Sequence, residues 1–300
     1  MGDSVESEVE LVELGPDAGE VRALGLDPVG NHWVGAFADD RLIGAAGWAF
    51  ADSVRLSAVV VAPEWRRQGI GGALVAAAEE LAAGFAAELS PHMRVQGSYS
   101  DEPRSLVTSG THITADAADE AGAAWLRGLG YAGVGLSLTR PLPVLLAVPT
   151  AKAMQALGER LGQLFRAGDL VILTGDLGAG KTTLTQGIGV GLGIAEAITS
   201  PTFVLSRIHR GVAGPDLVHV DAYRLGGDEV DDIDLDSDLA ESVTVIEWGA
   251  GVAEQLSEDR LEIEIRRSED PADNAREVVL RPVGPRWAAA DFTPLKGEPR

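Results

Sequence analysis

The stretch from Gly175 to Thr182, which reads GDLGAGKT, restricts the fold of this chain more than any other feature. It fits the pattern G-x-x-x-x-G-K-[ST], in which small residues let backbone N–H groups close around phosphate oxygens. The mostly apolar run Asp169 to Thr174 before it predicts a short buried strand, and Thr182 to Leu192 after it is compatible with a helix. A strand, a glycine-rich loop and a helix in this order predict a P-loop α/β domain.

The chemistry of a P-loop assigns roles to its residues. The N-terminus of a helix carries a partial positive charge, which favours a bound phosphate. Lys181 is expected to reach the β- and γ-phosphates of a nucleotide, and Thr182 is expected to offer its hydroxyl to Mg²⁺. The loop residues expected to bind the nucleotide are Asp176, Leu177, Gly178, Ala179, Gly180, Lys181, Thr182 and Thr183.

Two carboxylates follow apolar runs downstream of this loop. Asp221 comes directly after Leu217 to Val220, and Glu247 comes directly after Val243 to Ile246. Ligands of parallel sheets collect at the C-terminal ends of the strands, so both carboxylates are expected near the phosphate site. Because a P-loop enzyme needs such an acid to hold the Mg²⁺ shell or a water molecule, the sequence predicts Asp221 and Glu247 as catalytic residues.

The charge of the chain limits what it can bind. The formal net charge is −22 at pH 7, and the sequence pI is about 4.5. A chain with this charge repels phosphate backbones, so direct and tight nucleic-acid binding is not expected. A role in RNA chemistry would therefore run through a protein partner. The sequence contains no cysteine, which excludes disulfides and thiolate zinc sites.

No segment predicts a membrane span or a secretory signal. Residues Met1 to Glu10 are acidic and lack the apolar centre of a signal peptide. The apolar run Val144 to Val148 is far too short to cross a bilayer. We therefore expect a cytoplasmic protein that does not bind membranes.

The length of 300 residues favours two domains. Pro141 and Pro143 mark the predicted boundary, because two nearby prolines interrupt both helix and sheet. We expect a first domain over residues 1–140, a linker over 141–148 and a second domain over 149–284. Two further segments are expected to lack regular structure, the polar loop Gln96 to Thr114 and a disordered tail over 285–300, in which Trp287 can still dock.

Four motifs in the C-terminal half together resemble one known family. They are Gly175 to Thr183, Thr199 to Phe203 (TSPTF), His219 to Arg224 (HVDAYR) and Val245 to Gly249 (VIEWG). In this order, and over about Val148 to Pro282, the chain is similar to the TsaE family, the ATPase of bacterial tRNA threonylcarbamoyladenosine biosynthesis. The resemblance implies a P-loop NTPase fold, ATP and Mg²⁺ as ligands, and the TsaD and TsaB proteins as partners. It also implies that ATP hydrolysis resets a transferase complex rather than performing the carbamoyl chemistry.

The same resemblance implies roles for single residues. The lysine and the backbone amides of Gly178 to Thr183 are implied to bind the ATP phosphates, with Trp248 beside the nucleotide. Thr182 and Glu247 are implied to hold Mg²⁺, and Asp221 is implied to assist hydrolysis.

The N-terminal half carries a second signature within Val59 to Gly71. Its R-x-x-G-x-G core runs from Arg66 to Gly71 and places backbone amides at a helix N-terminus, where they can face a pyrophosphate. Together with Ala124 to Tyr131, this resembles the GNAT acetyltransferases, which implies a mixed α/β fold and acetyl-CoA as ligand. The residues implied to bind acetyl-CoA are Val61, Arg66, Arg67, Gln68, Gly69, Gly71 and Gly72.

One position departs from the GNAT pattern. Many members carry a tyrosine general acid where this chain has Leu126. A general acid is typically worth about 10²–10⁴-fold in rate, so we expect slow or very selective acetyl transfer.

These signatures predict an α/β protein with a GNAT-like mixed α/β domain followed by a P-loop NTPase α/β domain. The predicted function is that of an ATPase component required for tRNA threonylcarbamoyladenosine modification, with an attached acetyl-CoA-binding domain. The alternative is an N-acetyltransferase with a regulatory nucleotide-binding domain. A P-loop kinase is disfavoured, because no Arg-rich lid follows the P-loop helix.

Overall fold

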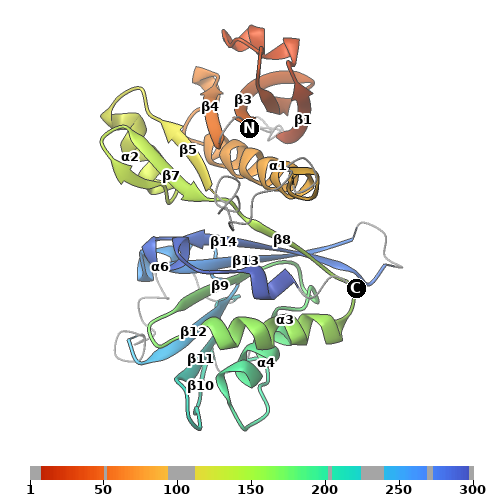
Figure 1. Cartoon of the computed structure of the whole chain (residues 1–300), viewed down its shortest axis with the longest axis vertical. Helices are drawn as coiled ribbons and strands as arrows, with labels where there is room; N and C mark the ends of the chain where they lie inside the picture. Colours follow the sequence, from red (N-terminus) through yellow and green to blue (C-terminus); the bar gives the residue numbers. More distant parts are fainter. Residues whose placement is uncertain are drawn as a thin grey trace, which may run out of the picture. The chain divides into compact units, whose positions relative to one another are not determined.

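The computed structural model describes residues 8–50, 53–93, 112–201, 205–223, 240–268 and 273–296. The chain divides into two compact units, Met1–Pro143 and Val144–Arg300, which we describe separately (Figure 1). Each unit has a seven-stranded sheet with helices and its own hydrophobic core. The fold class is therefore mixed α/β in both halves, as the sequence predicted.

The sheet of the N-terminal unit has the strand order β1-β2-β3-β4-β5-β7-β6. Its neighbours are antiparallel except for β4 and β5, which are parallel. The elements of this unit are β1 (Glu10–Pro16), η1 (Gly19–Leu24), β2 (His32–Ala38), β3 (Arg41–Phe50), β4 (Val54–Val61), η2 (Pro63–Trp65), α1 (Ile70–Met93), β5 (His112–Asp116), α2 (Glu120–Gly128), β6 (Ala132–Val134) and β7 (Ser137–Pro141).

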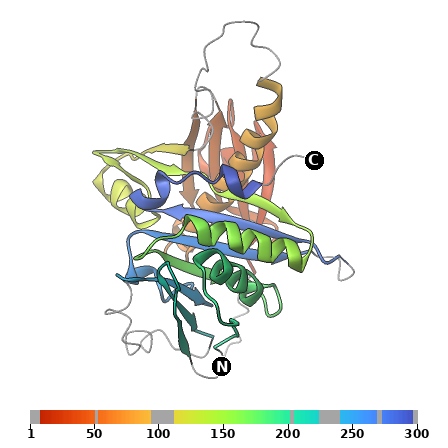
Figure 2. The same ribbon diagram turned by 60° about the horizontal axis from the view of Figure 1, so that its bottom comes forward.

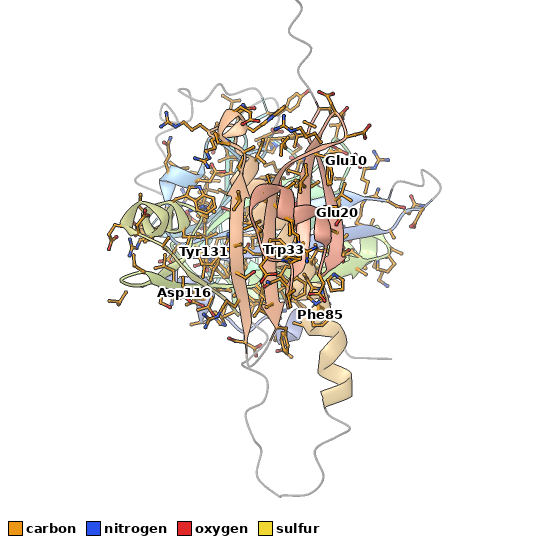
Figure 3. All side chains as sticks on the ribbon, turned by 90° about the horizontal axis from the view of Figure 1, so that it is seen from above. Glu10, Glu20, Trp33, Phe85, Asp116 and Tyr131 are labelled. Carbon is orange, nitrogen blue, oxygen red and sulfur yellow. The ribbon has the colours of Figure 1, made fainter. Side chains whose placement is uncertain are left out.

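The core of the N-terminal unit lies between α1 and the sheet. Leu74, Ala78 and Ala82 recur every four residues along α1, so they form one apolar stripe, and all three are buried. Trp33, on β2, belongs to a second and smaller core that includes η1 residues. Figure 3 marks Trp33 among the strands of this sheet and Phe85 on α1.

The described pairing between the parallel strands β4 and β5 covers only the first residues of β4. It runs from Val54 opposite Ile113 to Leu56 opposite Ala115. Strand β4 continues to Val61, and its residues 58–61 are half-buried. Among the described residues, the second half of β4 therefore pairs with β3 alone, and it leads into the loop before α1.

The sheet of the C-terminal unit has the strand order β10-β11-β12-β9-β13-β14-β8. The four central strands β11, β12, β9 and β13 are parallel, and the outer pairs are antiparallel. The elements are β8 (Val144–Val148), α3 (Ala151–Leu164), β9 (Leu170–Thr174), α4 (Lys181–Leu192), β10 (Ser206–His209), β11 (Asp216–Asp221), β12 (Ser242–Glu247), η3 (Glu254–Leu256), β13 (Arg260–Arg267), β14 (Arg276–Val283), α6 (Pro285–Ala288) and η4 (Thr293–Lys296).

Strands β11, β12 and β9 are almost wholly buried on both faces, which is typical of parallel strands that are covered on both sides, whereas β13 alternates buried apolar residues with half-buried polar ones. On β9, Val171 and Leu173 join the core that contains α3 and α4 residues, whereas Leu170 and Ile172 join a second core. Figure 2 shows α3 and α4 side by side in this unit. Because β9 is anchored in both cores, the position of the P-loop that follows it is fixed relative to the sheet.

Helices α3 and α4 approach each other more closely than larger side chains allow. Gly158 and Gly162 of α3 face Gly187 and Gly191 of α4, and an added Cβ on Gly158 would lie 2.9 Å from the Cα of Gly187. The glycines are four residues apart on each helix, so they lie on one face. This contact holds the beginning of α3 next to the P-loop.

Gly187→Ala is expected to destabilise the C-terminal unit. The new methyl group would overlap the backbone carbonyl of Gln155, and such overpacking costs about 1–3 kcal/mol. That cost exceeds the gain of about 1 kcal/mol that alanine brings inside a helix. Gly84→Ala in α1 is the matched control, because no atom lies within 4 Å of its added Cβ. Thermal unfolding measures both variants, and a Gly187→Ala protein as stable as the parent would contradict the backbone contact.

Residues 141–148 are not a linker, in contrast to the prediction. Val144–Val148 form β8, which pairs with β14 from Val144 opposite Leu280 to Val148 opposite Arg276. The prolines do interrupt the chain between β7 and β8, but the apolar residues after them join the second sheet. Leu146 and Val148 are buried in its core.

The tail after Pro285 is ordered in the described residues up to 296, which corrects the expectation of a disordered segment. Trp287 on α6 is 1% exposed and packs edge-on against Phe165. Arg286 donates two hydrogen bonds of 3.0 Å to the carboxylate of Asp169. The docking of Trp287 and this buried ion pair hold the segment on the C-terminal unit.

The predicted loop over Gln96 to Thr114 extends too far. Residues 94–111 lie outside the described part, but His112–Asp116 form β5. Only Ile113 and Ala115 of this strand are apolar and buried, which made its pattern too short to recognise. The strand is defined by its parallel pairing with β4, which lies far from it in the sequence.

The longest described helix is α1, with 24 residues. It carries Glu79 and Glu80 near its middle. None of the helices in the described ranges is long and apolar enough to cross a membrane.

Candidate functional site

The P-loop lies between β9 and α4 and adopts a conformation that requires glycine. Gly175, Gly178 and Gly180 have positive φ values of 135°, 77° and 118°. An added Cβ on Gly175 would also overlap the carbonyl oxygen of Ile265 on the neighbouring strand. Helix α4 begins at Lys181, so the loop wraps around a helix N-terminus.

Lys181 is folded back onto its own loop. Its Nζ donates hydrogen bonds to the carbonyl oxygens of Gly175 (2.6 Å) and Asp176 (3.1 Å) and lies 3.7 Å from the ring centroid of Trp248. Burial lowers the pKa of the Lys181 ammonium, and the carboxylates of Glu247, Asp221 and Asp176 act in the opposite direction. The side chain is thus held beside the space that the loop encloses.

Glu247 is the centre of the polar contacts at the end of β12. The hydroxyl of Thr182 donates to its Oε1 at 2.9 Å, and Nε2 of His219 lies 2.9 Å from the same oxygen. Glu247 and His219 are 3% and 0% exposed. A hydroxyl that gives its only hydrogen to a carboxylate turns its lone pairs elsewhere, and oxygen donors of this kind are what Mg²⁺ prefers.

Asp221 ends the neighbouring strand β11 and pairs in register with Glu247. Its Oδ1 accepts a hydrogen bond of 3.0 Å from the backbone N–H of Tyr223, which turns the chain after the strand. The side chain is buried. The strand order therefore brings both predicted acids to the same edge of the sheet, beside the P-loop strand β9.

Trp248 follows Glu247 in the left-handed region of backbone space, with φ of 63°. Such a conformation is uncommon for a bulky residue and costs free energy. The backbone N–H of Trp248 donates to Leu173 at 2.9 Å, and its ring lies 5.0 Å from the ring of Tyr223. The turn brings the indole over Lys181.

A cavity of about 380 Å³ lies beside the P-loop. It is bounded by the first turn of α3, by the loop and by the beginning of β14, where Arg276 donates a hydrogen bond of 3.2 Å to the carbonyl oxygen of Ala179. Sequence reasoning missed this part of the site, since nothing local links α3 or β14 to the loop. The lining residues are Pro149, Thr150, Ala151, Met154, Gly178, Ala179, Gly180, Thr183, Asn274 and Arg276.

The structure does not bring every residue of the predicted set into these contacts. Leu177 is 83% exposed at the tip of the loop. Thr202 and Phe203 of the TSPTF motif, and Arg224 of the HVDAYR motif, lie outside the described residues.

The loop before α1 forms the candidate site of the N-terminal unit. Arg67 and Gly69 have positive φ values of 65° and 81°, which turn the chain into the helix. The Nε of Arg66 donates to the carbonyl oxygen of Val61 at 3.0 Å, and Gln68 donates to that of Glu64 at 3.5 Å. Residues Arg66 to Gly69 of this loop are exposed, and the loop follows the half of β4 that pairs with β3 alone among the described residues.

Two glycines of α1 lie close to α2. An added Cβ on Gly71 would lie 3.2 Å from the ring of Trp125, and one on Gly72 would lie 3.5 Å from Leu129. Leu126 is buried in the core, so no proton donor stands at that position. Helix α1 therefore packs closely against Trp125 at Gly71.

Tyr131 and Glu79 are structural residues rather than a free acid and base. The hydroxyl of Tyr131 donates to Glu79 at 2.8 Å, and Arg140 lies 3.4 Å from the other carboxylate oxygen. All three side chains are buried. Burial and the carboxylate of Glu79 raise the pKa of Tyr131 above its usual value, with Arg140 acting in the opposite direction.

Comparison with known proteins identifies relatives of the C-terminal unit. The family described as threonylcarbamoyl adenosine biosynthesis protein TsaE matches residues 148–278. The protein named tRNA threonylcarbamoyladenosine biosynthesis protein TsaE from Streptomyces coelicolor is 57% identical over 148 residues, which are 48% of this chain and 100% of that protein. The protein of the same name from Bacillus subtilis is 38% identical over 134 residues, or 44% of this chain and 82% of that protein.

Solved structures and a second family match complete the comparison. The crystal structure of Bacillus subtilis YdiB has 32% sequence identity and a TM-score of 0.40, covering 48% of this chain and 88% of that one. The structure of AtaTR bound with acetyl-CoA has 17% identity and a TM-score of 0.28, covering 42% and 73%. The acetyltransferase (GNAT) family matches residues 8–97. The chain therefore belongs to the TsaE family through its C-terminal unit, and residues 8–97 of its N-terminal unit match the GNAT family.

Proposed function

We propose that this chain is the ATPase component of tRNA threonylcarbamoyladenosine modification. The observation that carries the proposal is the pairing of Thr182 with Glu247, a strand-end acid, beside a P-loop lysine. The relatives, which are named for this modification, support the biological assignment.

The P-loop and the cavity beside it suit a nucleoside triphosphate. The phosphates would lie within the loop, where backbone amides and the N-terminus of α4 offer positive charge. Lys181 would leave the carbonyl oxygens of Gly175 and Asp176 to meet the β- and γ-phosphates. The base and ribose would occupy the cavity between α3 and the loop, because Thr183 in the first turn of α4 and Gly178 to Gly180 of the loop line it.

The donor set of Thr182 and Glu247 fits Mg²⁺. One hydroxyl and one carboxylate, together with phosphate oxygens, give the oxygen-rich environment that this ion takes in P-loop enzymes. Bound there, Mg²⁺ would neutralise charge on the transferred phosphoryl group. Glu247 would hold the hydroxyl of Thr182 in place through their 2.9 Å hydrogen bond.

Asp221 would accept a hydrogen bond from the attacking water. It stands next to Glu247 on the adjacent strand, and its backbone turn is fixed by Tyr223. A carboxylate that orients a water molecule is a recurring part of phosphoryl transfer.

The partners would be the TsaD and TsaB proteins, and the cytoplasm would be the place of action. The net charge of −22 opposes direct and tight binding of tRNA, so RNA would be reached through these proteins. The chain alone would hydrolyse ATP slowly, because hydrolysis in the absence of TsaB and TsaD would consume ATP without resetting a complex.

Calorimetry with ATP and turnover assays with TsaB and TsaD test the proposal. We expect ATP to bind the chain alone, and we expect hydrolysis to rise when TsaB and TsaD are added. A chain that binds no nucleotide, or whose turnover ignores both proteins, would contradict it.

The N-terminal unit would bind acetyl-CoA as a separate domain with its own ligand. The amides of the exposed loop before α1 would face the pyrophosphate, and the second half of β4 would face the rest of the cofactor. With Leu126 buried and Tyr131 paired with Glu79, transfer would proceed without a side-chain acid at either position. We expect slow or selective acetylation.

Gly71→Trp is expected to abolish acetyl-CoA binding. Gly71 lies in the first turn of α1, where an added Cβ would already approach Trp125 to 3.2 Å, so a large ring there would be forced towards the loop that is proposed to hold the pyrophosphate. Gly84→Trp, in the same helix and with open space around it, is the matched control and is expected to bind normally. Calorimetry measures both. Equal binding by Gly71→Trp and the parent would move acetyl-CoA away from this loop.

A further inference from the structure

We propose that His219 is a positioning residue for Glu247. Its Nε2–H would hold the carboxylate in the orientation in which Glu247 and Thr182 together serve Mg²⁺. The inference rests on the proposed function, because it assumes that Glu247 faces the nucleotide-bound ion. It is carried by the 2.9 Å contact between Nε2 of His219 and Oε1 of Glu247.

The strand geometry explains why His219 can reach this carboxylate. Successive side chains of a strand point to opposite faces, so His219 and Asp221 lie on one face of β11. In the parallel pair β11 and β12, His219 stands opposite Val245 and Asp221 stands opposite Glu247. The imidazole therefore lies two residues before Asp221 along the strand, on the same face of the sheet as the two acids and within reach of Glu247.

The two hydrogen bonds of the carboxylate have a defined direction. An ionised carboxylate only accepts, so Thr182 and His219 must both donate to Oε1. The hydrogen of His219 then lies on Nε2. Both described bonds use the same oxygen, Oε1, which restricts the rotation of the carboxylate.

The surroundings of His219 favour this role over a purely structural one. Its neighbours Leu217, Val218 and Val220 are buried and apolar, and its Nδ1 has no hydrogen-bond partner among the described residues. A buried polar atom without a partner costs free energy, so an apolar side chain would serve the core better. The ring of His209 lies 6.5 Å away and is itself paired with Glu196.

Three substitutions separate the donated hydrogen bond from the presence of a side chain. His219→Gln keeps an N–H donor near the place of Nε2. His219→Met has a similar length without a donor, and His219→Asn has a donor that is too short to reach Glu247. His209→Gln is the matched control, because this second buried histidine does not touch Glu247.

The measurement is Mg²⁺ affinity, by calorimetry on the full chain saturated with the non-hydrolysable analogue AMPPNP. We expect His219→Met and His219→Asn to weaken Mg²⁺ binding by about 10–100-fold, the usual effect of losing a partner behind a metal ligand. His219→Gln and His209→Gln are expected to stay close to the parent. AMPPNP binding without Mg²⁺ is expected to be unchanged in all four.

The remaining outcomes each decide the matter. Equal Mg²⁺ affinity in the Gln, Met and Asn variants would overturn the positioning role while leaving the proposed function intact. A parent chain that binds no nucleotide would overturn both. If Met and Asn variants fail to fold while Gln folds, the hydrogen bond serves stability and the positioning role is also overturned.

Discussion

Lys181→Ala is expected to abolish productive ATP binding and to lower ATP turnover by at least about 10²–10³-fold, the effect of removing one charge-stabilising donor. The fold is expected to survive, because the side-chain ammonium meets carbonyl oxygens of its own loop and the face of Trp248 rather than a charged partner in the core. Its buried ammonium is costly without a phosphate, and burial already lowers its pKa. Calorimetry and a phosphate-release assay measure the loss.

Lys152→Ala is the matched control for this substitution. Lys152 lies on α3 of the same unit and is exposed to solvent. We expect its removal to leave ATP binding and turnover unchanged. A folded Lys181→Ala variant with the turnover of the parent would remove the P-loop from the mechanism.

Glu247→Gln is expected to separate nucleotide binding from hydrolysis. The amide keeps the shape of the side chain but loses the charge that would meet Mg²⁺, so turnover is expected to fall by about 10²-fold. Binding of ATP without Mg²⁺ is expected to stay close to that of the parent. A titration of turnover against Mg²⁺ concentration measures the effect.

Glu241→Gln provides the control for the charge change. Glu241 is exposed and directly precedes β12, whereas Glu247 is buried at the opposite end of that strand. We expect no change in the Mg²⁺ dependence of this variant. If Glu247→Gln behaves like Glu241→Gln, the magnesium site must be built from other residues.

The centre of the nucleotide site was predictable because its signals are local. The P-loop motif lies between a strand and a helix within one short stretch, and each acid directly follows an apolar run. The parallel arrangement then brings strand ends to one edge, which places Asp221 opposite Glu247. The strand before the P-loop, β9, and the helix after it, α4, also appear where they were expected.

The parts that sequence reasoning missed depend on contacts between distant segments. Strand β8 is defined by its pairing with β14, and α6 is held by Trp287 and by the ion pair of Arg286 with Asp169. The sequences of β8 and α6 alone do not reveal that β14 and Asp169 are the segments they contact. The cavity beside the P-loop depends in the same way on α3, the loop and β14 meeting in space.

Two missed features did leave a signal. Gly158 and Gly162 repeat at four-residue spacing, as do Gly187 and Gly191, which is the pattern of two helices in backbone contact. His219 stands two residues before Asp221, which places it on the same face of a strand. An apolar strand alone does not reveal the role of this histidine, but the structure shows its Nε2 at Glu247 and its Nδ1 without a partner among the described residues.

Reconstitution of tRNA threonylcarbamoylation with and without this chain tests the central claim most directly. The system contains tRNA, the TsaB and TsaD proteins, ATP and the precursors of the modification, and modified tRNA is counted per TsaD molecule. The account predicts many turnovers with the parent chain and almost none without it or with Lys181→Ala. Sustained modification in its absence, or full activity with the Lys181→Ala variant, would contradict the account.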